Sequence, residues 1–133
     1  MTATKSPTAS SAMKEASREM VRQSAGQLAG YLLESIGPRY TAVGVGLSDA
    51  RQIKMWRDTG SGPREAAVAA RLTTLAQVVR AIEIAYSADT AAAFLRSANP
   101  DLEDQPPLLV LADGDPLRAG TSVLRAVRSF LEP

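Results

Sequence analysis

The chain has 133 residues, with 15 Lys and Arg against 14 Asp and Glu, and it contains neither cysteine nor histidine. Its length fits one domain, or one small domain with an appended module. Without Cys and His, a disulfide framework, a zinc finger and the Ser-His-Asp and Cys-His catalytic systems are excluded. We therefore expect a protein that binds rather than catalyses, with no catalytic residue, metal or cofactor.

The apolar composition predicts an all-α fold. Ala and Leu, which favour helices, number 23 and 14, whereas the β-branched Val and Ile number only 9 and 4. No stretch approaches the roughly 20 consecutive apolar residues of a membrane span. The first sixteen residues also lack the apolar run of a signal peptide. We expect a cytoplasmic protein that does not contact a membrane.

The N-terminal part reads as a tail followed by a long helix. Residues 1–11 are rich in Thr, Ser, Ala and Pro, which predicts disorder. From about Ala12 to Ile36 apolar residues recur every three or four positions, which predicts one helix. Gly26 and Gly30 lie inside it and indicate either a break or close packing. Gly37 and Pro38 then end it, and Pro38 can open the next helix.

The segment 38–57 has the outline of a helix-turn-helix. Gly44 and Gly46 allow a tight turn, and Ser48 or Asp49 can cap a new helix. Ile53 and Trp56 would face inward, and the outward face would carry basic and amide side chains. Between residues 38 and 64 there are five basic and two acidic residues, an excess of +3. Such charge also serves solubility alone, so spacing leaves DNA contact and a merely solvated surface equally open.

The longest periodic stripe follows a flexible loop at residues 59–62, and Pro63 is placed at its first helical position. Apolar residues spaced alternately by four and three predict a core helix, with a dimerisation seam as the alternative. The members of this stripe are Val68, Leu72, Leu75, Val79, Ile82 and Tyr86.

The C-terminal part predicts shorter elements. Ser87 to Thr90 would cap an Ala-rich helix that ends near Arg96, because Asn99-Pro100 forbids its continuation. Residues 101–107 form a polar loop before an apolar turn at 108–111. Asp115 and Pro116 would open a final helix whose buried face includes Val123, Val127 and Phe130.

Several short motifs are weak. Gly44-Val-Gly46 and Gly60-Ser-Gly62 lack the remaining residues of nucleotide-binding loops and are interpreted as turns. Asp113-Gly-Asp115 lacks the closing Glu of a calcium loop and is interpreted as a helix cap. The acidic cluster of Asp101, Glu103 and Asp104 could bind the basic residues of a partner or a metal, or it could be a solvated loop.

The second half resembles a known family. Thr90-Ala-Ala-Ala-Phe-Leu-Arg-Ser-Ala-Asn-Pro-Asp-Leu, the following Pro-Pro-Leu-Leu-Val-Leu, the Gly-Asp turn and the final Val-Leu-Arg-Ala-Val-Arg-Ser-Phe are similar to the toxin-binding domain of Xre/MbcA/ParS-type antitoxins. The first half resembles the family's Xre-like helix-turn-helix, in which the recognition helix runs into a Trp and a Gly/Pro loop. The resemblance spans about residues 24–132. Phe94, where members often have Trp, and the loose loop before Pro63 depart from the pattern.

The resemblance implies a type II antitoxin that covers the active site of a RES-domain, NAD-degrading toxin and represses its own operon. It implies a tail at residues 1–11, an Xre-like region at 12–88 and a toxin-binding domain at 89–133, joined by a long helix. A homodimer, or a hetero-oligomer with the toxin, is expected. The alternative is a stand-alone helix-turn-helix regulator of a phage or host. A small helical enzyme is disfavoured by the missing Cys and His.

Site residues are assigned on this basis. Operator DNA would be contacted in the major groove by Ser48, Arg51, Gln52 and Lys54, and at its phosphates by Arg39, Arg57 and Arg64. The toxin surface would be formed by Phe94, Leu95, Asn99 and Pro100, together with Arg118, Arg125 and Arg128 on the last helix. Phe94 and Leu95 have a core position as their alternative, and the three arginines have solubility charge. Trp56 is assigned to the core.

Overall fold

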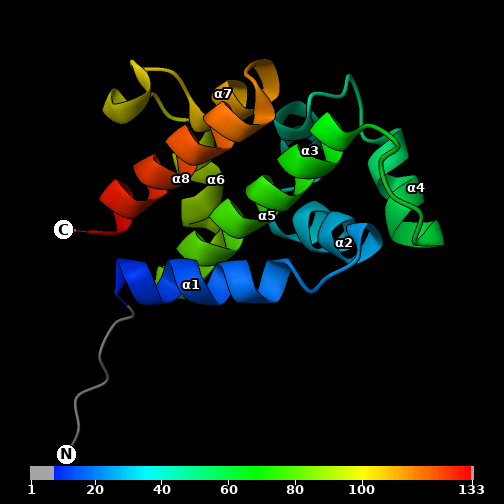
Figure 1. Ribbon diagram of the computed structural model, residues 1–133, viewed down its shortest axis with the longest axis horizontal. Coiled ribbons are helices and arrows are strands. Elements are labelled where there is room, and N and C mark those ends of the chain that lie inside the picture. The colour runs from blue at the N-terminus through cyan, green and yellow to red at the C-terminus, as the bar shows by residue number, and fades with distance from the viewer. Residues whose placement is uncertain (1–7, 133) are drawn as a thin grey trace, which may run out of the picture.

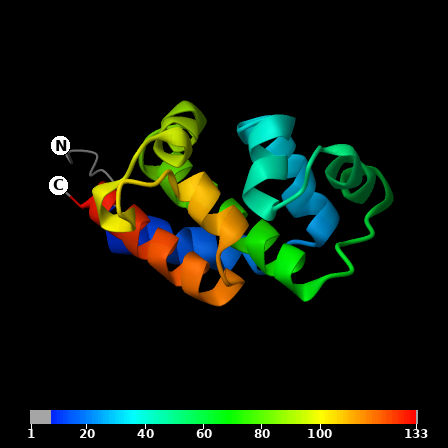
Figure 2. The ribbon, with the colours of Figure 1, turned by 90° about the horizontal axis from the view of Figure 1, so that it is seen from above.

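A computed structural model describes residues 8–132, which form eight α-helices and one short 3₁₀ turn, with no strand in this range. Figure 1 shows α5 crossing the middle of the molecule, with α1 along one side and α8 along another. Seen from above, α4 lies at one end, and the start of α1 and the end of α8 lie at the other (Figure 2). The helices are α1 (Ala9–Met20), α2 (Ala25–Ser35), α3 (Pro38–Val45), α4 (Arg51–Thr59), α5 (Ala66–Ala85), α6 (Ala88–Arg96), α7 (Pro107–Asp113) and α8 (Pro116–Leu131), with η1 at Pro100–Leu102. The all-α prediction is confirmed for this range.

The N-terminal helix begins earlier than the sequence indicates. The predicted tail covers residues 1–11, but Thr8 caps α1 by accepting a hydrogen bond from the Ser11 N–H, and the helix begins at Ala9. Residues 9–11 are therefore helical, while 1–7 lie outside the described residues. Apolar side chains that recur every three or four residues explain this start, because they form a narrow face that packs against α5. The buried members are Ala9, Ala12, Ala16 and Met20.

The predicted single helix from Ala12 to Ile36 is wrong, because the chain breaks between Met20 and Ala25. Ser24 and Gln27 form a capping box: each side chain accepts a hydrogen bond from the other's backbone N–H, at 3.2 and 2.9 Å. Val21, one of the apolar residues that recur along the predicted helix from Ala12 to Ile36, lies in the break and is 61% exposed. The break comes before Gly26, where the chain instead packs closely.

Gly26 is the point at which α2 approaches α4. A Cβ atom added there would lie 2.6 Å from the carbonyl oxygen of Trp56 and 3.0 Å from the Cα of Gly60, both of which are backbone atoms. Gly30, one turn later, would meet only the flexible Cγ of Arg57 at 3.4 Å. Close packing, one of the two alternatives for these glycines, therefore applies at Gly26.

We expect Gly26→Ala to destabilise the protein by about 1–3 kcal/mol, because the α4 backbone must move to admit the methyl group. Gly30→Ala is the matched control. It is expected to be neutral, or to stabilise by up to about 1 kcal/mol through helix propensity, since its neighbour can rotate away. Urea unfolding of the two variants measures the difference. Equal stabilities would contradict the close approach of α2 and α4.

The two short helices and their turn form where the sequence places them. Gly37, at φ 89°, precedes Pro38 at the first turn of α3, and Gly46, at φ 82°, ends that helix in a left-handed conformation. The Asp49 carboxylate accepts a hydrogen bond from the Arg51 N–H, the first of α4, at 3.0 Å, as one of the two predicted alternatives, while the N-cap position itself is Ala50. Pro63 does not open the next helix as predicted. Residues 60–65 are irregular, and α5 begins at Ala66.

α5 is the core helix around which six of the other helices pack, while α4 packs on α2. Five of the six predicted stripe residues are buried, but Tyr86 ends the helix and is 60% exposed. α5 also buries Ala76, Val78 and Ala81, because it contacts α1, α2, α3, α6, α7 and α8 on several sides. The core alternative for this stripe is therefore confirmed over its buried part, and Tyr86 is the exception.

The C-terminal elements begin at the predicted caps, but the predicted apolar turn at 108–111 is the helix α7, and the predicted polar loop at 101–107 includes part of η1 and the first residue of α7. Ser87 caps α6, and the Asp115 carboxylate caps α8 by accepting a hydrogen bond from the Arg118 N–H at 3.1 Å. Between them, Asn99 holds the polar loop: its side-chain oxygen accepts the Asp101 N–H at 2.9 Å, and its carbonyl accepts the Asp104 N–H at 2.9 Å. On α8, Phe130 is 41% exposed and departs from the predicted buried face.

A polar network ties α1 and α2 to α5. The guanidinium of Arg80 donates two hydrogen bonds to the Glu19 carboxylate, at 2.6 and 3.3 Å, and one to Glu83 at 2.9 Å. The Tyr31 hydroxyl donates to the same Glu83 oxygen at 2.7 Å. The hydrogen bonds from Arg80 lower the pKa of Glu19, and burial raises the pKa of Tyr31 above its usual value. This network connects α1, α2 and α5 through their side chains.

Candidate functional site

The outward face of α4 is the most prominent charged surface of the N-terminal half. Ile53 and Trp56 are buried at 0% and 2% exposure and pack α4 onto the core, as predicted. Because these two residues turn inward, Arg51 and Lys54 are exposed on the opposite side, and Gln52 is exposed on the flank of the helix that faces residues 61–65. The Arg51 side chain is 90% exposed. The helix therefore offers guanidinium, amide and ammonium donors to a partner outside the protein.

Two of the arginines on α4 are paired with neighbouring carboxylates. Arg51 donates from Nε and Nη2 to Asp49, with the shortest contact at 2.8 Å, and Arg57 donates to Asp58 at 2.8 Å. Hydrogen bonds from the arginines lower the pKa of both Asp49 and Asp58. Both pairs are exposed, so water and salt screen them and their geometry is held weakly. Both guanidinium groups therefore remain open to solvent around their pairs.

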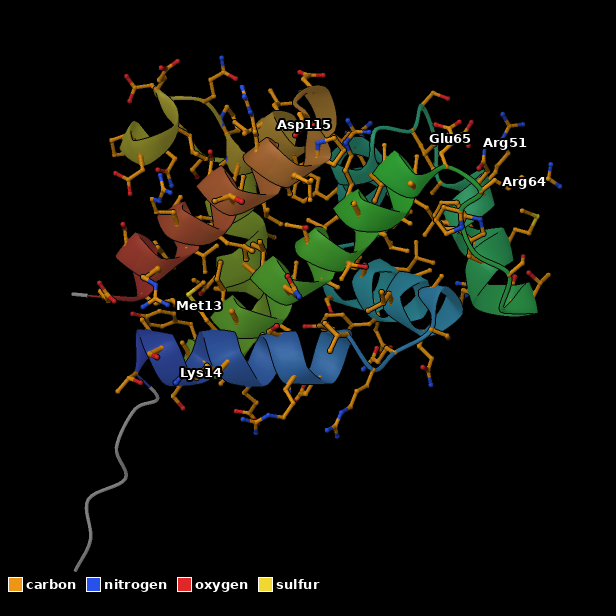
Figure 3. The ribbon with its side chains drawn as sticks, viewed as in Figure 1. Met13, Lys14, Arg51, Arg64, Glu65 and Asp115 are labelled. Carbon is orange, nitrogen blue, oxygen red and sulfur yellow. The ribbon has the colours of Figure 1, made fainter. Side chains whose placement is uncertain are left out.

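The remaining predicted DNA contacts flank α4. Arg39 in the first turn of α3 and Ser48 in the turn before α4 are exposed. Figure 3 shows Arg64 and Arg51 at the same end of the molecule, with Glu65 beside them. Glu65 follows directly after the basic segment 38–64. Including Glu65 makes five basic and three acidic residues over 38–65, which lowers the local excess from +3 to +2.

Phe94 and Leu95 occupy the core rather than the surface. Leu95 is fully buried and Phe94 is 6% exposed, because both lie on the inner face of α6. The Phe94 ring packs beneath that of Phe130 with centroids 5.0 Å apart, and the Tyr86 ring meets Phe130 edge-on at 5.9 Å. These two residues therefore take the core position that the sequence analysis gave as their alternative, and they do not form part of the exposed surface of the C-terminal half.

The other predicted toxin contacts reach solvent to different degrees. Pro100 is exposed at the start of η1, whereas Asn99 is half-buried and its side chain is engaged in capping the loop. On α8, the three arginines are exposed, and Arg128 lies 3.8 Å from Glu132. Arg118 and Arg125 are seven residues apart and share one side of the helix. The structure therefore brings Pro100 and the α8 arginines to the surface of the C-terminal half.

Arg71 was not identified from the sequence as a structural residue. From α5 it donates to the carbonyl oxygens of Leu111 and Gly114, both at 2.9 Å, and so caps the end of α7. Its guanidinium also lies beside the turn after α3, since a Cβ at Gly46 would meet its Nη1 at 3.4 Å. One side chain thus connects the turn before α4 to α7. Its partners are 40 and 43 residues away in the chain, and no local spacing signals them.

Within residues 8–132, no group of three or more Cys, His, Asp and Glu residues is arranged to hold a metal ion. In the same range no helix is both long and apolar enough to cross a bilayer. Comparisons of the chain with protein-family models, with curated proteins and with solved structures give no match. The outward face of α4 and the exposed residues of η1 and α8 are therefore the candidate functional surfaces.

Proposed function

We propose that this protein is an antitoxin that binds operator DNA through α3 and α4 and covers a RES-domain toxin with its C-terminal half. The observation that carries the DNA-binding part of the proposal is the exposed donor face of α4, held outward by the buried Ile53 and Trp56. A nine-residue helix measures about 14 Å, and a major groove about 12 Å wide admits a helix of this kind. In this proposal α4 is the recognition helix of a helix-turn-helix.

Specific residues take roles in DNA binding. Arg51, Gln52 and Lys54 would face the base edges, together with Ser48 at the turn. The phosphates on either side would be contacted from three other positions, at Arg39, Arg57 and Arg64. The exposure of Arg51 supports this role, because its pair with Asp49 is held weakly and DNA can displace the carboxylate.

The toxin-binding role depends on the resemblance and on the surface of the C-terminal half. Pro100 in η1 and the exposed arginines of α8 supply the surface, while Phe94 and Leu95 support it from the core. Arg118, Arg125 and Arg128 would reach toward the cleft in which the toxin binds its anionic nucleotide substrate. Any chemistry would belong to the toxin.

Co-expression tests this function directly. The full chain is produced with the RES-domain toxin encoded beside its own gene, and cellular NAD and co-purification are measured. We expect NAD to be preserved and the two proteins to purify together. A toxin that stays active and unbound would overturn the antitoxin proposal.

A stand-alone DNA-binding regulator is the second candidate function. Two observations favour it: the α4 face needs no other protein to be exposed, and two of the seven predicted toxin contacts are buried in the core. Binding of promoter DNA by the chain, together with no binding of the neighbouring toxin, would select this candidate.

A further inference from the structure

A groove lies between η1, α7 and α8, outside the surfaces assigned above. Its volume is about 400 Å³. Its apolar lining comes from Leu102, Leu109 and Val110, and Leu109 is 45% exposed although it stands on a helix of the core. Covering an aliphatic side chain that is this open to water removes apolar surface from water, and this stabilises the complex with the partner.

The rim of the groove is acidic. Asp101, Glu103 and Asp113 line it, and no Lys or Arg does. Among residues 8–132 these three carboxylates form no ion pair. Three like charges around an apolar floor repel nucleic acid and attract a cationic partner. The groove therefore has the opposite preference to that of α4.

The side of the acidic rim that carries Asp101 and Glu103 is held by its own backbone hydrogen bonds. Glu103 and Asp104 both adopt the left-handed conformation, at φ 56° and 64°. Hydrogen bonds on Asn99 hold this turn: its N–H donates to the Gln105 carbonyl at 3.3 Å, and its own carbonyl accepts from Asp104. A preformed rim binds without a large cost in ordering its loop.

We infer that this groove binds a protein segment in which an aliphatic side chain is flanked by Arg or Lys residues. The aliphatic side chain covers Leu109 and Val110, and the flanking cations meet Asp101 and Asp113 across the groove. The partner is another protein rather than a second copy of this chain. Pairing α4 with the groove of another copy would be a head-to-tail contact that does not close, and a contact through the exposed arginines of α8 is the second-copy outcome that the titration below tests.

The groove adjoins the surface proposed for the toxin. Ser122 lines it from α8, one turn from both Arg118 and Arg125, and η1 begins at Pro100. Naming the toxin as the source of the basic segment rests on the proposed function. The groove would then add an acidic and apolar contact beside the basic ridge of α8, so the toxin surface would carry the complementary pattern.

Peptide titration of the ¹⁵N-labelled full chain tests the inference without the toxin. The probe is acetyl-Arg-Leu-Leu-Arg-amide, and the controls are acetyl-Glu-Leu-Leu-Glu-amide and acetyl-Arg-Gly-Gly-Arg-amide. We expect saturable amide shifts at Leu102, Val110 and Ser122 with the probe only. The double variant Asp101→Asn/Asp113→Asn is expected to weaken binding about tenfold, because each rim charge contributes modestly at the surface. The matched variant Glu34→Gln/Asp89→Asn, which alters exposed acids away from the groove, is expected to bind normally.

Three results would overturn the inference: equal binding of the acidic peptide, shifts that map away from the groove, or groove shifts that grow with protein concentration in the absence of peptide. The last result would assign the groove to a second copy. The outcome is independent of toxin neutralisation. Peptide binding without toxin binding would keep the groove and remove the toxin as its partner, whereas toxin binding without peptide binding would reject the groove alone.

Discussion

Replacing Arg51 and Lys54 together with alanine is expected to lower the affinity for the protein's own promoter DNA about 30-fold or more. Both side chains are exposed on α4, and each good contact to a base or phosphate contributes about 1–3 kcal/mol. The salt dependence of binding is expected to fall as well, because fewer counterions are released. Fluorescence anisotropy at several salt concentrations measures both effects.

The control for this variant is Lys14→Ala/Arg18→Ala on α1. Lys14 and Arg18 are also exposed, and replacing them removes the same formal charge. They lie on a different helix from Arg51 and Lys54, and Figure 3 labels Lys14. We expect the control to retain nearly full affinity and both variants to unfold at the same urea concentration. Equal loss in the two variants would mean that DNA responds to net charge alone, and unchanged binding by Arg51→Ala/Lys54→Ala would reject α4 as the recognition helix.

Leu95→Ala is expected to destabilise the protein by about 2–5 kcal/mol. Leu95 is fully buried in the core between α6 and its neighbours, so the substitution removes buried methyl groups and leaves a cavity. Toxin binding would then fall only in proportion to unfolding. Urea unfolding and toxin pull-down of the same preparation, at a temperature where the variant stays folded, separate the two effects.

The surface counterpart is Arg118→Ala/Arg125→Ala. Both arginines are exposed on α8, so we expect stability to change by no more than about 0.5 kcal/mol while toxin binding weakens. A Leu95→Ala protein that keeps its stability and still loses the toxin would contradict the core position of Leu95 and return it to the contact surface.

Local chemistry predicted most of the helix boundaries. Gly37 and Pro38, the turn at Gly46, the cap at Ser87 and the Asp115-Pro116 start all depend on backbone conformation or on hydrogen bonds within four residues. Such signals are readable from sequence because the residues that interact are neighbours in the chain.

The errors have different physical causes: a local Ser-x-x-Gln capping box ends the predicted long helix at Ser24, whereas tertiary packing decides where α1 begins. The apolar spacing of residues 21–36 continues through the break at Ser24, so periodicity alone joined α1 to α2. The helix start at Ala9 depends on small side chains that pack against α5. The composition of residues 1–11 predicted disorder because it contains no information on this packing. Pro63 can open a helix, but the chain remains irregular until Ala66.

The candidate sites show the same division. The outward face of α4 follows from its periodicity, since burying Ile53 and Trp56 fixes what faces away. The core position of Phe94 depends on Phe130, which is 36 residues later in the chain. The network of Arg80 with Glu19 joins residues 61 apart. Neither relation leaves a pattern in the sequence.

Hydrogen exchange of the full chain, free and in complex with its promoter DNA and the co-purified toxin, tests the central claim most directly. The account predicts slower exchange in two separate regions: α3 and α4 when DNA is bound, and η1, α7 and α8 when the toxin is bound. Exchange in α4 that DNA leaves unchanged, or slowing by both partners over one shared region, would contradict it.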